Sequence, residues 1–484
     1  MQEVVSVKVM RESDEATIKN KIPSLELMQR AGEAVFKSYT WQGKTAIVCG
    51  GGNNAGDGYV LAALLGDRCR LFLLCDKFSP DGKICFDKCV KSGVQYSFID
   101  ESTTFDGFDT IVDCIFGTGF YGEVTGMAKW VIDKINQSNA YVISVDIPSG
   151  LNGDTGLGNS VISDMTVSIG TIKTGLVLNE AKDKIKKLVN CPIGIDITGE
   201  RYYLLDKEDF LGVIPQRKNF SHKGTYGYTA LWGGCEEYSG AVKLANMSLS
   251  SLKAGCGVNK LIVNESIAQA VAPYLLESTL FKMPHGFNKE KIDEALCGVK
   301  CLAIGMGWGK GEEHEKILSY ILENYAINLV IDADALNTLS AMDLDILKRT
   351  KCSVCLTPHV KEFSRLAKIG TDAVSFKKAS SFAEEYGVIV LLKGTATSVC
   401  NGSDIFFVQK GSQGMATAGS GDVLSGILCG LLGYMPMSIK TVALGAYIAG
   451  RAGEIAQSET NAVSMTSSDT VKNRGKAIGE IYGY

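Results

Sequence analysis

The chain has 484 residues, which is too long for one ordinary hydrophobic core, so we expect two or three domains. Apolar residues make up 45% and charged residues 21%, as in water-soluble globular proteins. The net charge of −4 favours neither nucleic acid nor an anionic membrane as a partner. The chain has no run of about 18 apolar residues to span a bilayer, and its first residues lack an apolar signal core. We therefore expect a cytoplasmic enzyme.

Two glycine-rich loops of different design lie next to apolar runs. Residues 50–58 read Gly-Gly-Gly-Asn-Asn-Ala-Gly-Asp-Gly and follow the apolar run 45–49. Residues 418–426 read Ala-Gly-Ser-Gly-Asp-Val-Leu-Ser-Gly and open an apolar helical stretch. A tight glycine turn before a helix aims backbone N–H groups and the helix dipole at an anion. The two loops predict two domains that each hold a phosphate-bearing ligand.

Short β-branched runs alternate with helical patterns in the first half of the chain. We predict a helix over residues 59–65 and strands at residues 45–49, 70–74, 110–113, 141–146 and 165–169. Apolar strands separated by helices are typical of a parallel sheet covered on both faces. Ligands of such sheets bind beyond the carboxyl ends of the strands. The first glycine loop, Asp113 and Asp146 all fall at that edge.

The alternating pattern breaks over residues 199–225, which are polar and contain Pro215. We place a domain boundary there, giving domains 1–205 and 206–484. A second series of strands is predicted at residues 228–232, 260–263, 301–304, 329–331, 353–356 and 388–392, followed by helices over 422–433 and 438–457. The predicted fold class is α/β, with two three-layer αβα domains.

Cysteine and histidine usage argues against redox chemistry and transition metals. The 15 cysteines lie mostly in apolar strand or helix patterns, where a free cysteine packs as a small hydrophobe. Cys352 and Cys355 have C-x-x-C spacing but no second pair or histidine cluster behind them, so we favour a structural role over a redox or zinc site.

Oxygen-bearing side chains gather at the carboxyl edge predicted for the first sheet. Asn53 and Asn54 offer neutral carbonyl oxygens, Asp113 a carboxylate and Ser149 a hydroxyl group. Hard oxygen ligands with one charge suit a large monovalent cation better than Mg²⁺. Asp146 ends a strand, where a carboxylate could act as a general base. The alternative is that all of these are turn residues bonded to nearby backbone.

Candidate residues in the second domain also follow strands or open helices. Asp422 lies in the first turn of a helix, where backbone N–H groups can stabilise a transferring phosphoryl group and the carboxylate can accept a proton. An ordinary N-cap is the alternative. Lys393 follows a strand and could contact a nucleotide, and His359 ends another strand over the same cleft, with Asp332 at a further strand end.

These motifs together resemble a known family. Residues 1 to about 205 resemble the NAD(P)H-hydrate epimerase domain, through residues 52–58, 113–119 and 145–150. Residues from about 207 to the end resemble the ADP-dependent NAD(P)H-hydrate dehydratases, which have a ribokinase-like fold, through residues 222–227, 239–241, 305–307, 332–336, 357–363, 393–394 and 419–422. The order of the two halves is that of the bifunctional nicotinamide nucleotide repair proteins, so the resemblance implies a Rossmann-like first domain and a ribokinase-like second domain.

The resemblance implies roles for residues of the first domain. K⁺ would be bound by Asn54, Asp113 and Ser149. Hydrated NADH or NADPH would contact Asn53, Asn54, Ala55, Gly56, Asp57, Gly117, Thr118, Gly119, Phe120, Tyr121, Gly122, Glu123 and Asp146. At Ala55 the family usually has glycine, and alanine would be strained if φ is positive there. Asp146 would act at carbon 6 of the hydrated ring, by moving a proton or by orienting the ring, so that the R and S epimers interconvert.

The resemblance likewise implies a kinase-like dehydration in the second domain. The S epimer would contact Ala241, Gly307, His359 and Asp422, while the nucleotide would lie on Lys393, Gly394, Thr395, Ala396, Thr397 and Gly421. ADP or ATP, with Mg²⁺, would phosphorylate the carbon 6 hydroxyl, with Asp422 as the base, and phosphate would then leave. The resemblance also implies a homo-oligomer. The alternative function is a vitamin or sugar kinase fused to a non-catalytic nucleotide-binding module.

Overall fold

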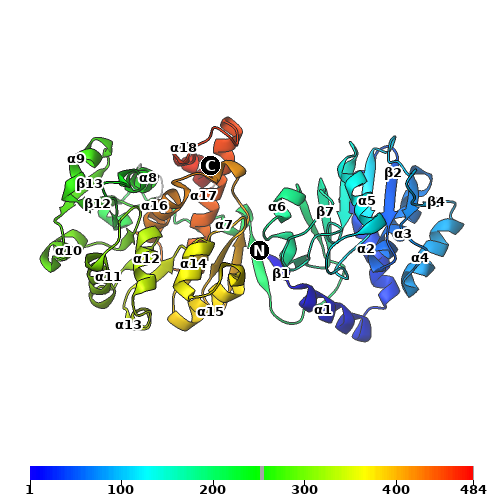
Figure 1. Cartoon of the computed structure of the whole chain (residues 1–484), viewed down its shortest axis with the longest axis horizontal. Helices are drawn as coiled ribbons and strands as arrows, with labels where there is room; N and C mark the ends of the chain where they lie inside the picture. The colour runs from blue at the N-terminus through cyan, green and yellow to red at the C-terminus, as the bar shows by residue number, and fades with distance from the viewer. Residues whose placement is uncertain (251–254, 483–484) are drawn as a thin grey trace. The chain divides into compact units, whose positions relative to one another are not determined.

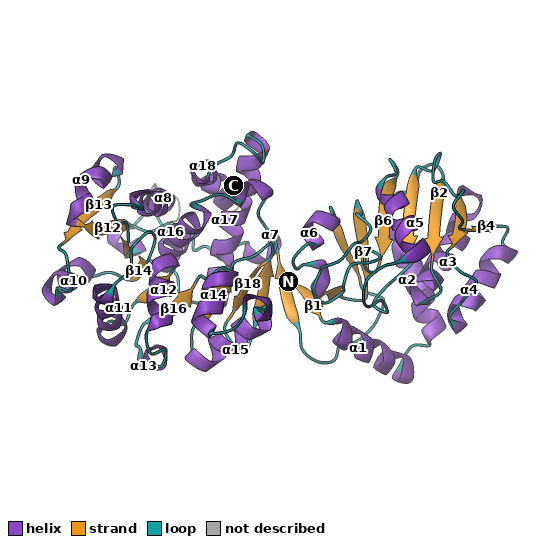
Figure 2. Ribbon diagram, in the orientation of Figure 1, coloured by secondary structure: helices purple, strands orange, loops and turns teal. Residues whose placement is uncertain are grey.

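A computed structural model describes residues 1–250 and 255–482 and divides into two compact units, Gln2–Tyr202 and Tyr203–Tyr484, the second grouped with Met1. Each unit has an α/β fold built on a mainly parallel sheet (Figures 1 and 2). Among the described residues, no helix combines the length and the apolar character needed to cross a membrane.

The sheet of the first unit has the strand order β4-β3-β2-β5-β6-β7-β9, and every neighbouring pair is parallel. Its strands are β2 (Thr45–Cys49), β3 (Cys69–Leu73), β4 (Gln95–Phe98), β5 (Thr110–Cys114), β6 (Tyr141–Val145), β7 (Met165–Ile169) and β9 (Leu188–Cys191). Two further strands, β1 (Gln2–Val5) and β8 (Ile172–Lys173), pair in parallel with each other. The five predicted strands are present, within one residue at each end.

Alternation along the strands of the first unit explains its three layers. Ile47 and Cys49 face a core shared with α2 (Ser24–Ser38), α3 (Asn53–Leu65) and α4 (Pro80–Lys91). Ala46 and Val48 face a second core shared with α5 (Gly126–Asn136). Because successive side chains of a strand point to opposite faces, apolar residues at every position require helices on both sides. The remaining helices are α1 (Val7–Asn20), α6 (Ala181–Lys184) and the 3₁₀ turns η1 (Gly66–Arg68) and η2 (Thr174–Leu176).

The sheet of the second unit runs β13-β12-β11-β14-β15-β16-β17-β18-β19-β10. It is parallel except where β18 pairs antiparallel with β17 and β19. Its strands are β10 (Tyr202–Leu205), β11 (Tyr228–Trp232), β12 (Val258–Asn264), β13 (Ser278–Met283), β14 (Cys301–Ile304), β15 (Asn328–Ile331), β16 (Ser353–Leu356), β17 (Ile389–Leu392), β18 (Thr397–Cys400) and β19 (Ile405–Val408). All six strands predicted in this half are present.

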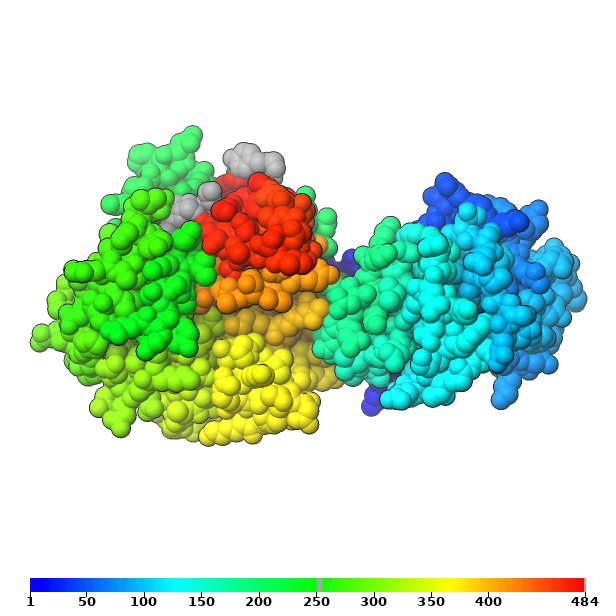
Figure 3. All heavy atoms as spheres, turned by 45° about the horizontal axis from the view of Figure 1, so that its top comes forward, coloured from blue at the N-terminus to red at the C-terminus, as the bar shows by residue number. Residues whose placement is uncertain are grey.

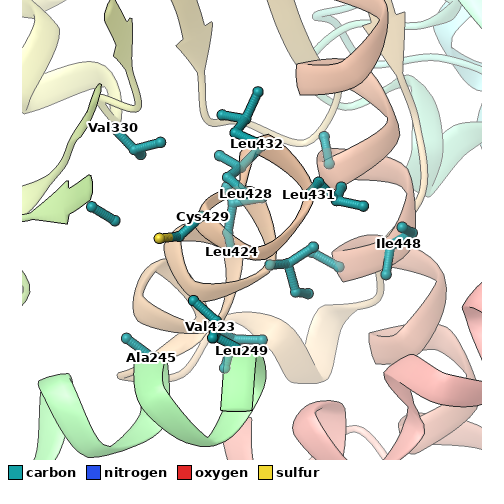
Figure 4. Packing of buried hydrophobic residues seen from close by; sticks show 14 of the residues in the cluster. Ala245, Leu249, Val330, Val423, Leu424, Leu428, Cys429, Leu431, Leu432 and Ile448 are labelled. Atoms are coloured by element: carbon teal, nitrogen blue, oxygen red, sulfur yellow. The ribbon is translucent and has the colours of Figure 1, made fainter. Parts of the chain in front are cut away.

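The core of the second unit is formed around α16 (Ser420–Leu432), which is buried from Val423 to Leu432. Figure 4 shows Leu428 and Cys429 of this helix among Val330 of the sheet and Ala245 of α8 (Ser239–Ser250). On its other side α16 packs against α17 (Ile439–Glu459), against which α18 (Ser467–Tyr482) packs in turn, seen as the red segment in Figure 3. The predicted helices 422–433 and 438–457 correspond to α16 and α17.

The opposite face of this sheet is covered as well, because the alternate strand residues Leu302, Leu329 and Leu356 are also fully buried. The helices not yet named are α7 (Lys207–Phe210), α9 (Ala268–Val271), α10 (Lys289–Leu296), α11 (Glu312–Asn324), α12 (Ala333–Ala341), α13 (Ile346–Arg349), α14 (Val360–Ala367) and α15 (Phe376–Tyr386). The 3₁₀ turns are η3 (Lys223–Tyr226), η4 (Glu265–Ile267), η5 (Ala272–Tyr274), η6 (Thr371–Ala373) and η7 (Gln413–Met415).

Candidate functional site

The first glycine loop is shorter than the sequence pattern indicates. Only residues 50–52 form the loop, with Gly52 as the N-cap of α3, and the helix already begins at Asn53. The prediction of a loop over residues 53–58 and a helix from residue 59 is therefore wrong. Backbone N–H groups in the first turn of a helix have no intrahelical partners. Ala55 lies in this turn without a positive φ, so alanine is not strained there.

A cavity of about 870 Å³ opens at the carboxyl edge of the first sheet. Nine of the predicted ligand contacts line it: Asn53, Asn54, Asp57, Gly117, Thr118, Gly119, Phe120, Tyr121 and Asp146. The other four do not: Ala55 is buried, a Cβ on Gly56 would lie 2.3 Å from Met28 Sδ, and Gly122 and Glu123 are exposed outside the cavity.

Helix α1, which the sequence did not reveal, forms another part of the cavity wall. It contributes Arg11, Asp14 and Glu15. The guanidinium group of Arg11 donates a hydrogen bond to Thr118 O and lies 5.2 Å from the ring of Tyr121. Arg11 thus ties α1 to the loop that follows β5. Three charged residues within one amphipathic helix are common in protein sequences, so they did not indicate a site.

The predicted cation ligands Asn54, Asp113 and Ser149 lie together behind this cavity. Asp113 is fully buried in β5 and accepts hydrogen bonds from Ser144 Oγ and Ser149 N, both at 2.9 Å, and from Ser149 Oγ. Asn54 donates to Phe116 O at 2.9 Å and to Val145 O at 3.1 Å. Asp113 lies within a strand and not in a turn, although its Oδ1 also accepts a hydrogen bond from the nearby backbone, from Ile115 N at 3.2 Å.

Within the part of the chain that the structure describes, two side chains of this group lack a partner: one has a buried oxygen without a hydrogen bond, and the other is a carboxylate without an ion pair. Asn54 Oδ1 is buried and has no hydrogen-bond partner. The Asp113 carboxylate accepts only from neutral donors, and burial raises its pKa while the hydrogen bonds from Ser149 oppose that rise. Among the described residues, no lysine or arginine forms an ion pair with it. A buried carboxyl group and an orphaned oxygen, linked through Ser149 and the Phe116 backbone, fit a monovalent cation.

Asp146 has a strained backbone at the end of β6. Its φ is +68°, a region that non-glycine residues rarely adopt. Its N–H donates to Val167 O at 2.8 Å, and its Oδ1 accepts from Lys173 Nζ and from Ile169 N. Lys173, in β8, is almost fully buried, and it was not among the predicted site residues. A lysine inside the apolar run of residues 169–177 was the signal that could have identified it.

Carboxylates dominate the charge of the cavity. Burial, followed by the charge of Asp146, raises the pKa of Asp57 well above its ordinary value. Burial also raises the pKa of Asp14, against the opposing effect of Lys173. Two carboxyl groups with raised pKa values thus lie beside an ion-paired one. Sites that pair acid and base groups divide them in this way.

In the second unit, residues that follow β15 and β17 meet Glu362 of α14 at the N-terminus of α16. Lys393 Nζ lies 2.9 Å from Asp332 Oδ1 and 3.7 Å from Glu362 Oε2. A Cβ on Gly421 would lie 3.4 Å from Lys393 Nζ, so the first turn of α16 faces this ion pair. Asp422 belongs to the same turn, as predicted, and burial, then the charge of Asp332, raises its pKa to about 7.

His359 and the loop after β17 complete this edge. His359 is the N-cap of α14: its Nδ1 accepts from Lys361 N and Glu362 N, and its own N–H donates to Glu362 Oε2 at 2.9 Å. Lys393 N donates to Pro358 O at 2.8 Å, which joins the two loops. Gly394, Thr395 and Ala396 form the turn between β17 and β18, and Thr397 begins β18.

Ala241 and Gly307, both predicted to contact the S epimer, lie against each other. Gly307 has a φ of +59°, and a Cβ there would lie 2.6 Å from Tyr238 O and 3.1 Å from the Cβ of Ala241. Helix α8, which carries Ala241, packs along α16, and Leu244 of α8 contacts Gly419. Glycine is therefore required at position 307, because a side chain there would collide with Tyr238 and Ala241.

The 15 cysteines form no disulfide bond. Cys352 and Cys355 are buried, and burial raises the pKa of both thiols, so neither is a reactive thiolate. These properties are those of cysteines that pack as apolar side chains.

Comparisons with known proteins match both units. A family model described as YjeF-related protein N-terminus matches residues 24–175, and one described as NAD(P)H-hydrate dehydratase matches residues 229–474. A ribokinase-like superfamily protein from Enterococcus faecalis is 23% identical, with a TM-score of 0.51 over 58% of this chain and 96% of its own. The Bacillus subtilis ADP/ATP-dependent NAD(P)H-hydrate dehydratase, co-crystallised with ATP/Mg²⁺, is 22% identical, with a TM-score of 0.51 over 58% and 99%. The class is thus a two-domain α/β enzyme whose second domain is ribokinase-like.

Relatives of nearly the same length identify the family. The bifunctional NAD(P)H-hydrate repair enzyme Nnr of Moorella thermoacetica is 32% identical over 93% of this chain and 91% of its own. The enzyme of the same name from Escherichia coli is 30% identical over 92% and 87%. The chain belongs to the family of bifunctional NAD(P)H-hydrate repair enzymes.

Proposed function

We propose that the chain repairs hydrated NADH and NADPH with two activities. Residues 1–205 would form the epimerase domain, which interconverts the R and S hydrates, and residues 206–484 would form the dehydratase domain, which converts the S hydrate to NAD(P)H with ADP or ATP. The observation that carries the proposal is Asp422, a carboxyl group with a pKa of about 7 in the first turn of α16, next to the Lys393–Asp332 pair. Near-full-length similarity to repair enzymes supports the same function.

The second site has the parts that a phosphoryl transfer needs. The ionised Asp422 would accept the proton of the carbon 6 hydroxyl as its oxygen attacks the terminal phosphorus of the nucleotide. Backbone N–H groups at the start of α16 and the Lys393 ammonium group would stabilise the charge on the transferred group. The carbon 6–oxygen bond then breaks with help from the ring nitrogen's lone pair, phosphate leaves, and a proton leaves carbon 5. Phosphorylation thus turns a poor leaving group into a good one.

The nucleotide is proposed to bind on the same edge. Its phosphates would lie against Gly421 and Lys393, and the rest of it against the turn Gly394–Thr397. Mg²⁺ would arrive with the nucleotide and offset its charge, which the nearby carboxylates of Asp332 and Glu362 would otherwise repel. His359 and the Ala241–Gly307 pair would contact the hydrated nicotinamide ring.

The first site is proposed to act at the same carbon of the ring. Asp146 ends β6 with Oδ2 facing Gly117, where a Cβ would lie 3.2 Å from that oxygen. Its carboxylate would accept the proton of the carbon 6 hydroxyl or hold the ring. Asp57, which favours the protonated form, could donate a hydrogen bond to the ligand. Gly117 and Gly119 in the loop after β5 would let the backbone approach the ring closely.

K⁺ is proposed to bind behind this site. The orphaned Asn54 Oδ1 and the buried charge of Asp113 fit a large monovalent cation, with Ser149 Oγ as a further oxygen ligand. The cation would hold together the loops after β2, β5 and β6, which carry the residues lining the cavity. It would also offset the buried carboxylate.

One assay tests both activities. The protein is incubated with an equimolar mixture of R and S hydrated NADH, ADP, Mg²⁺ and K⁺, and the absorbance of reduced nicotinamide is followed. Full recovery of NADH supports both activities, recovery of half supports the dehydratase alone, and no recovery overturns the proposal. Asp422→Asn should abolish recovery, whereas Asp146→Asn should limit the rapid phase to the S half. Phosphorylation of a vitamin or sugar without NADH recovery would favour the kinase alternative.

A further inference from the structure

The ammonium group of Lys173 is fully hydrogen-bonded within the first unit. Its Nζ donates to Asp146 Oδ1, to Ile169 O at 2.6 Å and to Ser168 Oγ at 3.4 Å. Its side chain is 1% exposed, and that of Asp146 is 14% exposed. An ammonium group has three N–H donors, and all three are used within the protein. Lys173 forms part of the cavity wall, but it has no N–H donor left for a ligand there.

The Lys173–Asp146 ion pair matters because the backbone of Asp146 is strained. A φ of +68° at a non-glycine residue costs free energy and persists only where the surroundings hold it. Lys173 and Ile169 N both bind Oδ1, which leaves Oδ2 turned toward Gly117 and the cavity. The ion pair therefore determines which carboxylate oxygen a ligand meets.

The charges around Asp146 make Lys173 hard to replace. The charge of Asp146 raises the pKa of Asp14 on α1 and of Asp57 on α3, and the charge of Lys173 on β8 lowers both. Without the ammonium group, the Asp146 carboxylate would lie near two other carboxyl groups and would lose the cation that binds its Oδ1. Oδ2 would then no longer be held by an ion pair in its direction toward the cavity.

We propose that Lys173 is the positioning residue of the epimerase site: its buried ammonium group holds the Asp146 carboxylate in place, with Oδ2 turned into the cavity. This inference rests on the proposed function, and it adds a residue that makes no contact with substrate. Lys173 affects the reaction only through Asp146. Removing Lys173 should therefore have no further effect on the reaction once Asp146 is disabled.

A double-mutant cycle tests the proposal in the full-length protein. Lys173→Met keeps the length and apolar packing of the side chain, and Asp146→Asn removes the base. Each single variant should lower the epimerisation kcat by roughly 100-fold, within the range for loss of a general base, with a much smaller change in KM. The double variant should be no slower than Asp146→Asn. A further 10-fold loss, or full activity of Lys173→Met, would overturn the proposal.

Two measurements separate positioning from a merely structural role. Lys173→Ala opens a gap beside the cavity, so added propylammonium should restore part of the lost kcat, whereas uncharged propanol should not. Equal rescue by both, or rescue by neither, would overturn a role for the charge. Dehydration of the S hydrate, in the other unit, is the control for the amount of intact protein, and the thermal unfolding of the first unit is the control for its folding.

Thermal unfolding separates failure of this inference from failure of the proposed function. A wild-type protein that binds but does not epimerise the hydrates refutes the function directly. The pair itself is tested in either case: Lys173→Met should lower the Tm, and Asp146→Asn in the same chain should recover part of the loss, because the unpaired buried charge is gone. Strictly additive Tm changes would show that Lys173 does not hold Asp146.

Discussion

Asp332 connects Lys393 to Ser425 in the second unit. Its Oδ1 accepts from Lys393 Nζ at 2.9 Å and its Oδ2 accepts from Ser425 Oγ at 2.7 Å. Burial lowers the pKa of Lys393, but the charges of Asp332 and Glu362 outweigh this effect and raise it, so the ammonium form persists. Asp332 thereby joins the loop after β17 to the second turn of α16, the helix that carries Asp422.

Lys393→Met should lower both stability and dehydratase activity. Removing one partner of a buried ion pair leaves an uncompensated charge at Asp332 and costs about 3–5 kcal/mol. The phosphoryl group would also lose its nearest cation, so we expect kcat to fall by roughly 100-fold or more, as for loss of one oxyanion-stabilising donor. Chemical denaturation and steady-state dehydration of the S hydrate measure the two effects. Unchanged stability with unchanged rate would show that the pair is dispensable.

The dehydratase rate should rise with pH through about 7 and level off above it, because Asp422 acts in its ionised form and its pKa is about 7. Stability should respond in the opposite direction. The pKa in the folded protein lies above the ordinary value of 3.8, so the stabilising contribution of this group is complete below pH 3.8 and is lost as pH rises through about 7.

Asp422→Asn cannot titrate, so its Tm should exceed that of the wild type by more at pH 8 than at pH 5. A rate independent of pH between these values would contradict the assignment of Asp422 as the base.

Gly117→Ala should lower epimerase activity without unfolding the first unit. The backbone at Gly117 does not require glycine, but the new Cβ would lie 3.2 Å from Asp146 Oδ2 and 3.3 Å from Asn54 Cβ. We expect roughly a 10-fold loss of epimerase kcat/KM, the effect of about 1.4 kcal/mol at the transition state. Gly119→Ala is the matched comparison, since its Cβ meets no atom within 4 Å and its loss should be much smaller. If both variants lose the same activity, the contact of the new Cβ with Asp146 is not the cause of the loss.

K⁺ should stabilise the first unit, because it would bind the folded state and not the unfolded chain. At a hundredfold excess over Kd the gain is about 2.7 kcal/mol, which corresponds to a Tm increase of several degrees. The measurement compares KCl with choline chloride at equal ionic strength. Asp113→Asn should abolish the response, whereas Ser163→Ala, at a buried serine bonded to Thr166, should retain it. A shift that survives Asp113→Asn would place the cation elsewhere.

Strand positions and strand-end residues were predictable because they depend on local pattern. Continuous apolar runs identified β2, β7, β11, β14 and β16 at their observed bounds. Amphipathic or short elements were not found: α1 and α2 bury only one face, and β1, β8 and β10 have at most four residues. The start of α3 was placed too late, because asparagine and glycine favour turns in isolation and only packing against the sheet makes residues 53–58 helical.

The sequence by itself determined the α/β class, the two-part organisation and the identity of Asp113, Asp146, Lys393 and Asp422 as candidates, because strand patterns and glycine turns are local. Tertiary structure alone decided which charges meet. Lys173 is 27 residues from Asp146, and Lys393 is 61 residues from Asp332, yet each pair is in contact. Parallel strands bring distant chain segments to one edge of a sheet, and Coulomb interactions and burial then act between residues that no sequence spacing relates.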